Sequence, residues 1–573
     1  MKQPNTIYHS GRIPVLMAAL CGVLALVPAF IWGIPLGADL DAHFRFVMPF
    51  YDEIARGNIN PGWLAESNNG FGDARFRFYP PVMFYALSLF RWLTGDWYAA
   101  FLIAFTLFSV VGTVGVYLWA RQNLSPQTSV LAALIFAFVP YHLTQFYQAS
   151  LLLEFAASAF IPYAFLFLGR ITTGRGGRLP NIVGLSTAYS LIVLAHVPTT
   201  IIASISLAVF ALVTTKWTAY RRTILDSAAA IGLGLIMSSF FWVKVVSELG
   251  WIQAGQHVTS EHYVYTNNFL FSPFSLPNLN TWYGGLVAAL TVGFFLPSII
   301  ILPNLFARTT RTADSTIEQF QTVSLRSVAL VAAFAFLMTT DLSRPIWWLV
   351  PKLKDIQFPF RWLTIVSVMI CPLAAFALVA WKNRVRQIRP WHLLILLPFA
   401  ATVLFSINEL VIDSTYLGRQ KFTERIESVR GGRSFSDWLP VGAAELKDLA
   451  PLDGDIDAGG RTVIASDWQT HHRQLVLAAG EPVQVRLRSY YYPLWKATAK
   501  ISSRSISLPT SQAADGSLLI AVPAEASEVD VVFFEPPRTA VSVFIAVLGW
   551  TFALVLLLSS LLKDNGLRWP PAK

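Results

Sequence analysis

The chain has 573 residues, of which 54% are hydrophobic and only 13% are charged, and its mean hydropathy is +0.52. Soluble globular proteins carry about 25% charged residues, so this composition excludes that class. The formal net charge is +10, but the basic residues lie in short loops between apolar runs, which favours a membrane-topology bias and argues against nucleic-acid binding.

Apolar runs that approach the length needed to cross a bilayer, about 20 residues, recur along the whole chain. The first, from Ile13 to Ile34, is too long for a signal-peptide core and lacks a clear small-residue cleavage site, so we expect a retained helix. About twelve membrane-spanning helices are predicted. They lie near residues 13–34, 98–120, 127–142, 150–170, 181–198, 199–214, 225–243, 284–303, 327–340, 361–381, 391–410 and 539–562.

Lys and Arg residues occupy every second loop between these runs. Because basic loops stay on the cytoplasmic side, the alternation predicts that both termini are cytoplasmic. Three long segments then face outward, near residues 35–97, 244–283 and 411–538. The short apolar stretch 80–93 is predicted as an interfacial helix on the outer surface, because a span there would break the alternation.

The first outward segment opens with the sequence Gly37-Ala-Asp39-Leu-Asp41-Ala-His43-Phe-Arg45. Carboxylates beside a membrane surface can activate an acceptor hydroxyl as a general base, or hold a divalent cation. The same pattern also suits a solvated loop in which Asp side chains cap a helix. Both interpretations stay open.

The same segment continues with Asp73-Ala-Arg75-Phe-Arg77-Phe-Tyr79. If this stretch is extended, Arg75, Arg77 and Tyr79 share one face, and the two Phe side chains share the other. Guanidinium groups match phosphate oxygens, so the stretch could bind an anion. Contact of both arginines with lipid headgroups is the alternative.

Ionisable side chains are costly within a membrane and are candidates for a functional site. Several lie near the predicted outer ends of helices, at one depth below the long outward segments: His142, Glu154, His196, Lys244 and Arg361. Each has a structural explanation, such as an ion pair of Glu154 with Arg361 or Lys244, or a Lys244 that reaches out to the interface. Their shared depth favours a site for a phosphate or diphosphate whose tail lies in the bilayer.

The third outward segment changes character between residues 461 and 536. Val483, Val485 and Leu487 alternate with polar residues, as in a half-buried strand, and similar short runs follow. We therefore predict a membrane domain over residues 1–410, with a large first outer loop over 35–97. An extracytoplasmic β-rich domain, expected to be a sandwich, follows over 411–538, and a final helix with a cytoplasmic tail occupies 539–573.

Several common sites are absent from the sequence: a Walker loop, a dinucleotide-binding glycine motif after a strand, a zinc-ligand spacing and a nucleophile elbow. The two cysteines, Cys21 and Cys371, lie within apolar runs and indicate neither a disulfide framework nor a metal site. An activated donor would therefore come from elsewhere, and a membrane-soluble donor fits.

Four stretches together resemble a bacterial family of membrane proteins labelled as related to 6-pyruvoyl-tetrahydropterin synthase. They are Gly37-x-Asp39-Leu-x-x-His43-x-Arg45, Gly70-x-Gly72-x-x-x-Phe76-x-Phe78-Tyr79-Pro80-Pro81, Gln357-Phe-Pro-Phe-Arg361-Trp and Tyr490-Tyr-Tyr-Pro-Leu-Trp495-Lys. The label does not imply pterin chemistry. The family in turn resembles the GT-C glycosyltransferases, and the resemblance covers nearly the whole chain.

This resemblance implies a GT-C-like fold in the bacterial inner (cytoplasmic) membrane, with the active site facing the periplasm. It implies a polyprenyl-phosphate-linked sugar donor, a glycan, lipid or protein acceptor, and inversion at the anomeric carbon. GT-C enzymes place an acidic residue on the first outward loop, so Asp39 is the best candidate for the general base, with Asp41 as the alternative or as a metal partner. Whether a divalent cation, Mg or Mn, takes part stays open.

Arg361 and Lys244 are the predicted ligands of the donor phosphate. The other residues predicted to contact substrate are His43, Arg45, Arg75, Arg77, Tyr79, Glu154 and His196. Two other functions stay open. One is a transporter or flippase of lipid-linked glycans, whose site is expected nearer the membrane midplane. The other is a glycan-binding scaffold without catalysis.

Overall fold

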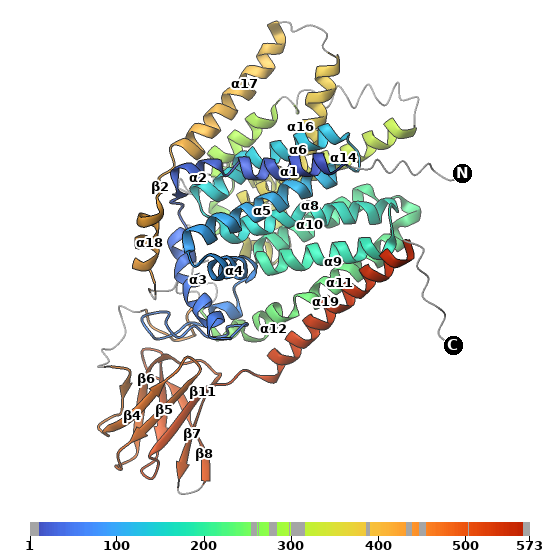
Figure 1. Cartoon of the computed structure of the whole chain (residues 1–573). Coiled ribbons are helices and arrows are strands. Elements are labelled where there is room, and N and C mark those ends of the chain that lie inside the picture. Colours follow the sequence, from blue (N-terminus) through green and yellow to red (C-terminus); the bar gives the residue numbers. More distant parts are fainter. Residues whose placement is uncertain are drawn as a thin grey trace, which may run out of the picture.

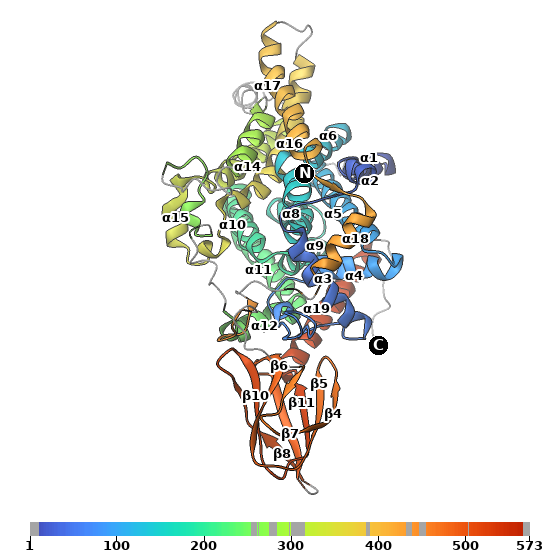
Figure 2. The ribbon, with the colours of Figure 1, turned by 90° about the vertical axis from the view of Figure 1, so that its left-hand side faces the viewer.

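The computed structural model describes residues 11–253, 261, 263–273, 284–296, 298, 316–384, 390–430, 432, 438–445, 454–501 and 504–564. A bundle of long helices forms most of the molecule, and a β-sandwich lies beyond one end of the bundle (Figure 1). The view from the side shows the same arrangement, with the sandwich below α12 (Ser239–Glu248) and the start of α19 (Pro537–Asp564) (Figure 2).

Six helices within the described residues are long and apolar enough to cross a bilayer. They are α5 (Trp97–Ala120), α8 (Leu152–Thr173), α9 (Arg178–Ala195), α10 (Val197–Thr214), α16 (Leu363–Arg384) and α19. Two further pairs pass only as bent spans: α6 (Pro126–Phe138) bends by 47° into the stretch Pro140–Gln148, and α11 (Tyr220–Met237) bends by 78° into α12.

Shorter or partly described apolar helices account for the other predicted spans. They are α1 (Arg12–Leu24), the helix Gly284–Leu296, α14 (Thr316–Leu337) and α17 (Pro390–Ile407). Every predicted span overlaps a helix. The count of about twelve is supported only in part, because the described residues hold six helices of spanning length, or eight if each bent pair is one span.

The retained helix predicted from Ile13 to Ile34 is broken into α1 and α2 (Val27–Trp32). Pro28 stands at the start of α2, where it has no amide hydrogen to donate and its ring interferes with the preceding turn. Neither helix alone reaches the length of a span.

The first outward segment contains regular structure that hydropathy and alternation do not predict. After β1 (Ile34–Pro35), which pairs with β2 (Tyr416–Leu417), the chain forms α3 (Leu40–Ala55). A later helix, α18 (Arg419–Ser428), lies against α3 in both views (Figures 1 and 2), with Phe422 packed edge-on against Phe44. The helix predicted at 80–93 is present as α4 (Val82–Thr94).

Short helical turns connect these elements. They are α7 (Pro140–Leu143), α15 (Arg344–Leu349), the 3-10 turns η1 (Arg75–Arg77), η3 (Trp217–Ala219), η4 (Leu249–Trp251), η6 (Tyr265–Asn267), η7 (Asp341–Ser343), η8 (Leu353–Ile356) and η9 (Pro359–Trp362), and the π-helical turns η2 (Thr144–Gln148) and η10 (Asn408–Ile412).

The β-sandwich consists of two antiparallel sheets with strand orders β3-β6-β10-β9 and β4-β5-β11-β7-β8. The strands are β3 (Ile456–Asp457), β4 (Val463–Trp468), β5 (His472–Leu477), β6 (Val483–Tyr490), β7 (Trp495–Ile501), β8 (Arg504–Leu508), β9 (Thr510–Gln512), β10 (Ser517–Val522) and β11 (Glu528–Phe533). The predicted alternation is present on β6, where Val485 and Leu487 are buried. The predicted β-rich part therefore lies between residues 456 and 533.

The core of the sandwich extends into the first outward segment. Trp63 is fully buried and its ring lies 5.6 Å from that of Trp495 and 5.2 Å from that of Phe533, measured between centroids. Phe71 packs against Tyr490, whose backbone N–H donates to the Phe71 carbonyl oxygen at 2.7 Å. The sandwich is thus built on the segment between α3 and α4 and not only tethered by α19.

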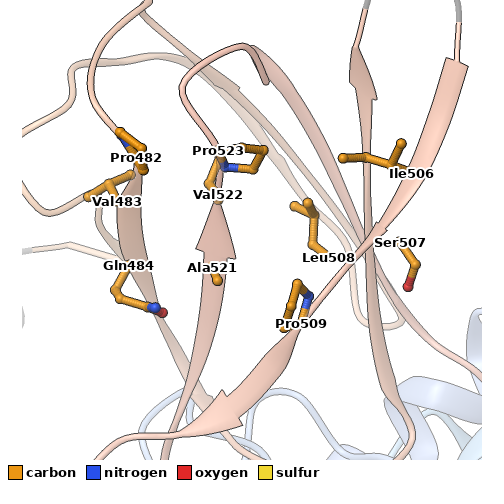
Figure 3. A pocket seen from close by; sticks show the side chains of 10 residues that line it. All are labelled: Pro482, Val483, Gln484, Ile506, Ser507, Leu508, Pro509, Ala521, Val522 and Pro523. Carbon is orange, nitrogen blue, oxygen red and sulfur yellow. The ribbon is translucent and has the colours of Figure 1, made fainter.

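A pocket of about 400 Å³ opens where β6, β8 and β10 meet (Figure 3). Prolines and aliphatic side chains form most of its wall, together with the amide of Gln484 and the hydroxyl of Ser507. None of the residues that line it is titratable, so this pocket contains none of the predicted site residues.

Candidate functional site

Asp39 lies on a short segment that two distant parts of the chain hold in place. Its backbone N–H donates to the carbonyl oxygen of Ala149 at 3.0 Å. The backbone N–H of Leu36 donates to the carbonyl oxygen of Thr415 at 2.8 Å, next to the β1–β2 pair. These contacts fix the backbone from which the Asp39 side chain projects.

Gly37 permits this close approach. A Cβ atom at position 37 would lie 2.5 Å from the backbone nitrogen of Ser150, a distance that real Cβ atoms do not reach. We therefore expect Gly37→Ala to displace the segment and to lower the free energy of unfolding by about 1–3 kcal/mol, as overpacking does. Gly418→Ala is the matched control, because a Cβ there meets nothing within 4 Å. Equal thermal unfolding temperatures for the two purified variants would contradict the packing argument.

Asp39 and Arg361 lie close enough to interact electrostatically. The Asp39 side chain is half-buried, and burial raises the pKa of Asp39 to about 6, while the positive charge of Arg361 opposes this rise. Arg361 is part of η9, which leads into α16. A carboxylate from the first outward segment and a guanidinium at the start of a late helix therefore belong to one group of side chains.

Glu154 is the second carboxylate of this group, and it is buried on α8. Its Oε1 accepts hydrogen bonds from the hydroxyl of Tyr141 at 2.6 Å, the amide of Gln145 at 3.2 Å and the hydroxyl of Thr364 at 2.7 Å. Its Oε2 lies 3.5 Å from Nε of Arg361. Arg361 thus pairs with Glu154, and its charge also acts on Asp39.

His43 and Arg75 adjoin this group from the first outward segment. Arg75 is fully buried, with its guanidinium carbon 3.4 Å from the ring centroid of Phe46 and its Nη2 3.1 Å from Oδ2 of Asp73. Burial, helped by the positive charge of Arg75, lowers the pKa of His43 to about 3. The imidazole of His43 is therefore neutral at neutral pH.

Tyr79 and His196 complete the group. The charges of Arg75, Asp39 and Arg361 all act on the hydroxyl of Tyr79, whose pKa is raised mainly by burial. His196, where α10 begins, is linked through Nδ1 to the hydroxyl of Thr199 at 2.7 Å and lies within the electrostatic reach of Arg361.

We call the seven predicted residues that the structure brings together the Asp39 group. Its members are Asp39, His43, Arg75, Tyr79, Glu154, His196 and Arg361.

Asp41 points away from the Asp39 group. Nε and Nη2 of Arg425 on α18 donate to its two carboxylate oxygens at 2.9 and 2.7 Å. Arg45 lies beside Gly432, where a Cβ would come within 3.4 Å of its Nε. Within the described residues no three His, Cys, Asp or Glu side chains gather in a way that could hold a metal ion, so a metal role for Asp39 and Asp41 stays a prediction.

The extended conformation considered for residues 75–79 is wrong. Residues Arg75–Arg77 form the 3-10 turn η1, and the backbone N–H of Tyr79 donates to the carbonyl oxygen of Arg75 at 2.9 Å. Asp73 initiates the turn, because its Oδ1 accepts a hydrogen bond from the backbone N–H of Arg75 at 2.8 Å. As a result, Arg75 and Arg77 enter different surroundings.

Arg77 belongs to a second group, which we call the Glu248 cluster. Glu248, fully buried on α12, accepts hydrogen bonds from Nε and Nη2 of Arg77, from Nη2 of Arg538 at 2.9 Å and from the hydroxyl of Tyr492 at 3.0 Å. Nη1 of Arg77 donates to Glu535 at 2.6 Å. The cluster joins four parts of the chain: η1, α12, the sandwich and the start of α19.

Lys244 also lies beside the Glu248 cluster. It is buried within α12, where its Nζ donates to Oδ1 of Asn60 at 2.9 Å. The predicted span over 225–243 is bent by 78° after Met237, so Lys244 lies inside the second arm and not at the end of a straight helix.

His142 is buried, and its ring is stacked on Phe155 with 4.5 Å between centroids. The sequence reasoning missed Tyr141, Gln145 and Thr364, the three donors to Glu154. Thr364 is a polar residue flanked by apolar ones, a signal that could have identified it, whereas Gln145 lies among other polar residues and gives no such signal.

Comparisons with known proteins concern the family and the fold. A family model described as "6-pyruvoyl-tetrahydropterin synthase related domain; membrane protein" matches residues 76–416. No curated protein gives a significant match. Among solved structures, ArnT from Cupriavidus metallidurans bound to undecaprenyl phosphate is similar, with 15% identity, a TM-score of 0.43 and 74% of each chain covered.

Two other solved structures show a comparable likeness. The arabinofuranosyltransferase AftD from Mycobacteria has 16% identity and a TM-score of 0.43, over 69% of this chain and 28% of that chain. The oligosaccharyltransferase from Archaeoglobus fulgidus has 12% identity and a TM-score of 0.38, over 74% of this chain and 57% of that chain.

Proposed function

The chain belongs to the family of membrane proteins described as 6-pyruvoyl-tetrahydropterin synthase related, which confirms the family predicted from its motifs, and from this premise we propose that it is a GT-C-type glycosyltransferase. It moves a sugar from a polyprenyl-phosphate donor to an acceptor at the periplasmic face of the bacterial inner membrane.

The observation that carries this proposal is the electrostatic interaction of Asp39 with Arg361. Asp39 is held on a segment with fixed backbone contacts, and the positive charge of Arg361 acts on its carboxylate. A base within electrostatic reach of a cation suits a displacement at a phosphate-linked carbon, because a proton must leave the acceptor while negative charge develops on the departing phosphate.

In the proposed reaction the acceptor oxygen attacks the anomeric carbon as its proton passes to the Asp39 carboxylate. The bond from that carbon to the phosphate oxygen breaks, and the phosphate leaves with the electron pair. The Arg361 guanidinium stabilises the charge that develops there. The mechanism gives inversion in a single displacement, and none of its steps is assigned to a metal ion.

Asp39 is favoured over Asp41 as the base for a geometric reason. Both carboxylate oxygens of Asp41 accept hydrogen bonds from Arg425. The charge of Arg361, in contrast, acts on Asp39. Asp41 is therefore already engaged by an arginine on both of its oxygens, and we favour Asp39 as the base.

Mass spectrometry of lipid-linked intermediates and surface glycans tests the proposed activity. Cells that lack the protein are expected to accumulate a polyprenyl-phosphate sugar and to lose that sugar from a glycan, lipid or protein. Restoring the wild-type gene should reverse both changes. Identical lipid-linked and surface profiles with and without the protein would contradict the proposal.

The activity is expected to fall as the pH drops through about 6. Above this value Asp39 is a carboxylate and can accept a proton, and below it the protonated acid cannot. Because Arg361 lowers the pKa of Asp39, Arg361→Gln should move the midpoint of kcat/KM to higher pH in addition to slowing transfer. A flat profile between pH 5 and 8 in membranes that contain the natural donor would rule out Asp39 as the base.

A further inference from the structure

One carboxylate oxygen of Glu154 is fully engaged by the protein. Its Oε1 accepts three hydrogen bonds, from Tyr141 on α7, Gln145 in η2 and Thr364 on α16. A buried carboxylate is stable only when such donors compensate for lost hydration. The three donors therefore fix the carboxylate plane, and with it the position of Oε2.

Arg361 is held from two sides. Its Nε lies 3.5 Å from Oε2 of Glu154, and its Nη1 donates to the carbonyl oxygen of Ile356 at 2.7 Å. Its guanidinium carbon is 5.0 Å from the ring centroid of Phe358. Only 15% of the Arg361 side chain is exposed. A guanidinium is planar, so two fixed nitrogens determine where the third one points.

We propose that Glu154 is a positioning residue that orients the guanidinium of Arg361 toward Asp39, and that it does not bind the substrate itself. This inference rests on the proposed function, since it explains how the cation beside the base is kept in one orientation. The other groups that the charge of Arg361 reaches are Tyr79, Tyr141 and His196. None of these three is a carboxylate, so among these groups of the described residues Glu154 supplies the second negative charge beside Arg361.

Glu154→Gln removes the negative charge beside Arg361 and keeps the size and most hydrogen bonds of the side chain. The amide oxygen of Gln can still accept the hydrogen bonds from Tyr141 and Thr364, but its NH₂ group then faces the Nε–H of Arg361, so a donor meets a donor. Thr364→Val is the matched control, because it removes one hydrogen bond to Oε1 and leaves the carboxylate charge beside Arg361. A purely structural role of Glu154 would make the two variants behave alike.

Modification of arginine by phenylglyoxal reports on Arg361 without any substrate. The purified full-length protein in lipid nanodiscs would be treated with phenylglyoxal, and peptides that contain Arg361 would be quantified by mass spectrometry over time. We expect Glu154→Gln to speed the modification of Arg361 about threefold to tenfold, the scale of one lost ion-pair contact. Arg344, which pairs with Asp341, serves as the internal reference.

An unchanged rate at Arg361 in Glu154→Gln would overturn the inference. So would an equal increase in Thr364→Val, because that result would show general loosening of the helices. The labelling involves no sugar transfer, so its failure would leave the glycosyltransferase proposal standing. Conversely, unchanged glycan profiles in cells that lack the protein would refute the transferase proposal but not the labelling result.

Discussion

Asp39→Asn is expected to lower sugar transfer by about 10²- to 10⁴-fold, the range that general-base catalysis contributes. The amide keeps the size of the side chain and its place on the fixed segment, but it cannot accept a proton. Binding of the donor should change little, because the attraction between phosphate and Arg361 remains. Transfer in membranes from cells that express the variant, followed by mass spectrometry of the product glycan, measures the effect.

Substitutions of two neighbouring carboxylates, Asp52 and Asp41, show whether a loss of transfer is specific to Asp39. Asp52→Asn is the control, because Asp52 forms an exposed ion pair with Arg430 and such pairs contribute at most about 1 kcal/mol. If Asp41→Asn abolishes transfer and Asp39→Asn does not, Asp41 is the base. If cells keep the glycan modification with both variants, the enzyme assignment fails and a flippase or a glycan-binding scaffold becomes the better interpretation.

Glu248→Gln is expected to lower the free energy of unfolding by about 3–5 kcal/mol, because breaking a buried ion pair leaves an uncompensated charge inside the protein. Glu248 accepts hydrogen bonds from Arg77, Arg538 and Tyr492, and the side chains of Arg77 and Glu248 have no exposed surface. Thermal unfolding of the purified protein, compared with wild type in the same detergent, measures the loss.

Glu528→Gln is the matched control for this second experiment, because Glu528 forms an exposed pair with Lys500 on the sandwich surface. Arg77→Met tests whether Arg77 is instead a ligand of the donor phosphate. The ion-pair assignment predicts a large fall in unfolding temperature. A phosphate-binding role predicts normal unfolding and weak donor binding, and that outcome would contradict the assignment of Arg77 to the Glu248 cluster.

The elements of the fold that have a strong local period could be predicted from the sequence. Apolar runs mark the helices because a spanning helix must be apolar along its length. Period-2 alternation marks strands such as β6 because one face of each strand packs in the core. Helix α3 escaped prediction because its Asp39–Arg45 start reads as a polar loop when only hydropathy is considered.

Single charged residues of the candidate site could be predicted from the sequence, but the contacts between them could not. Asp39 and Arg361 stand out because charged side chains are rare in this chain. Glu154 stands out for the same reason. Thr364, which donates to Glu154, does not, because the two residues meet across helices that lie far apart in the sequence. The pair of Arg77 with Glu248 depends in the same way on a bend of α11 into α12 that no local pattern specifies. Pairs of residues that are distant in the sequence depend on how the helices pack, which local sequence patterns do not specify.

The shared packing of Trp63 and Phe71 with the sandwich limits how the chain can be divided. Residues 456–533 cut out as a separate soluble fragment would leave the rings of Trp495 and Tyr490 without the partners that cover them. A fragment that keeps this packing would have to include the stretch between α3 and α4, joined to the sandwich by a linker. The same contacts join the sandwich to the stretch that leads into Arg75 and Tyr79, so a substitution in the sandwich core at Trp495 or Tyr490 also removes a packing partner of that stretch.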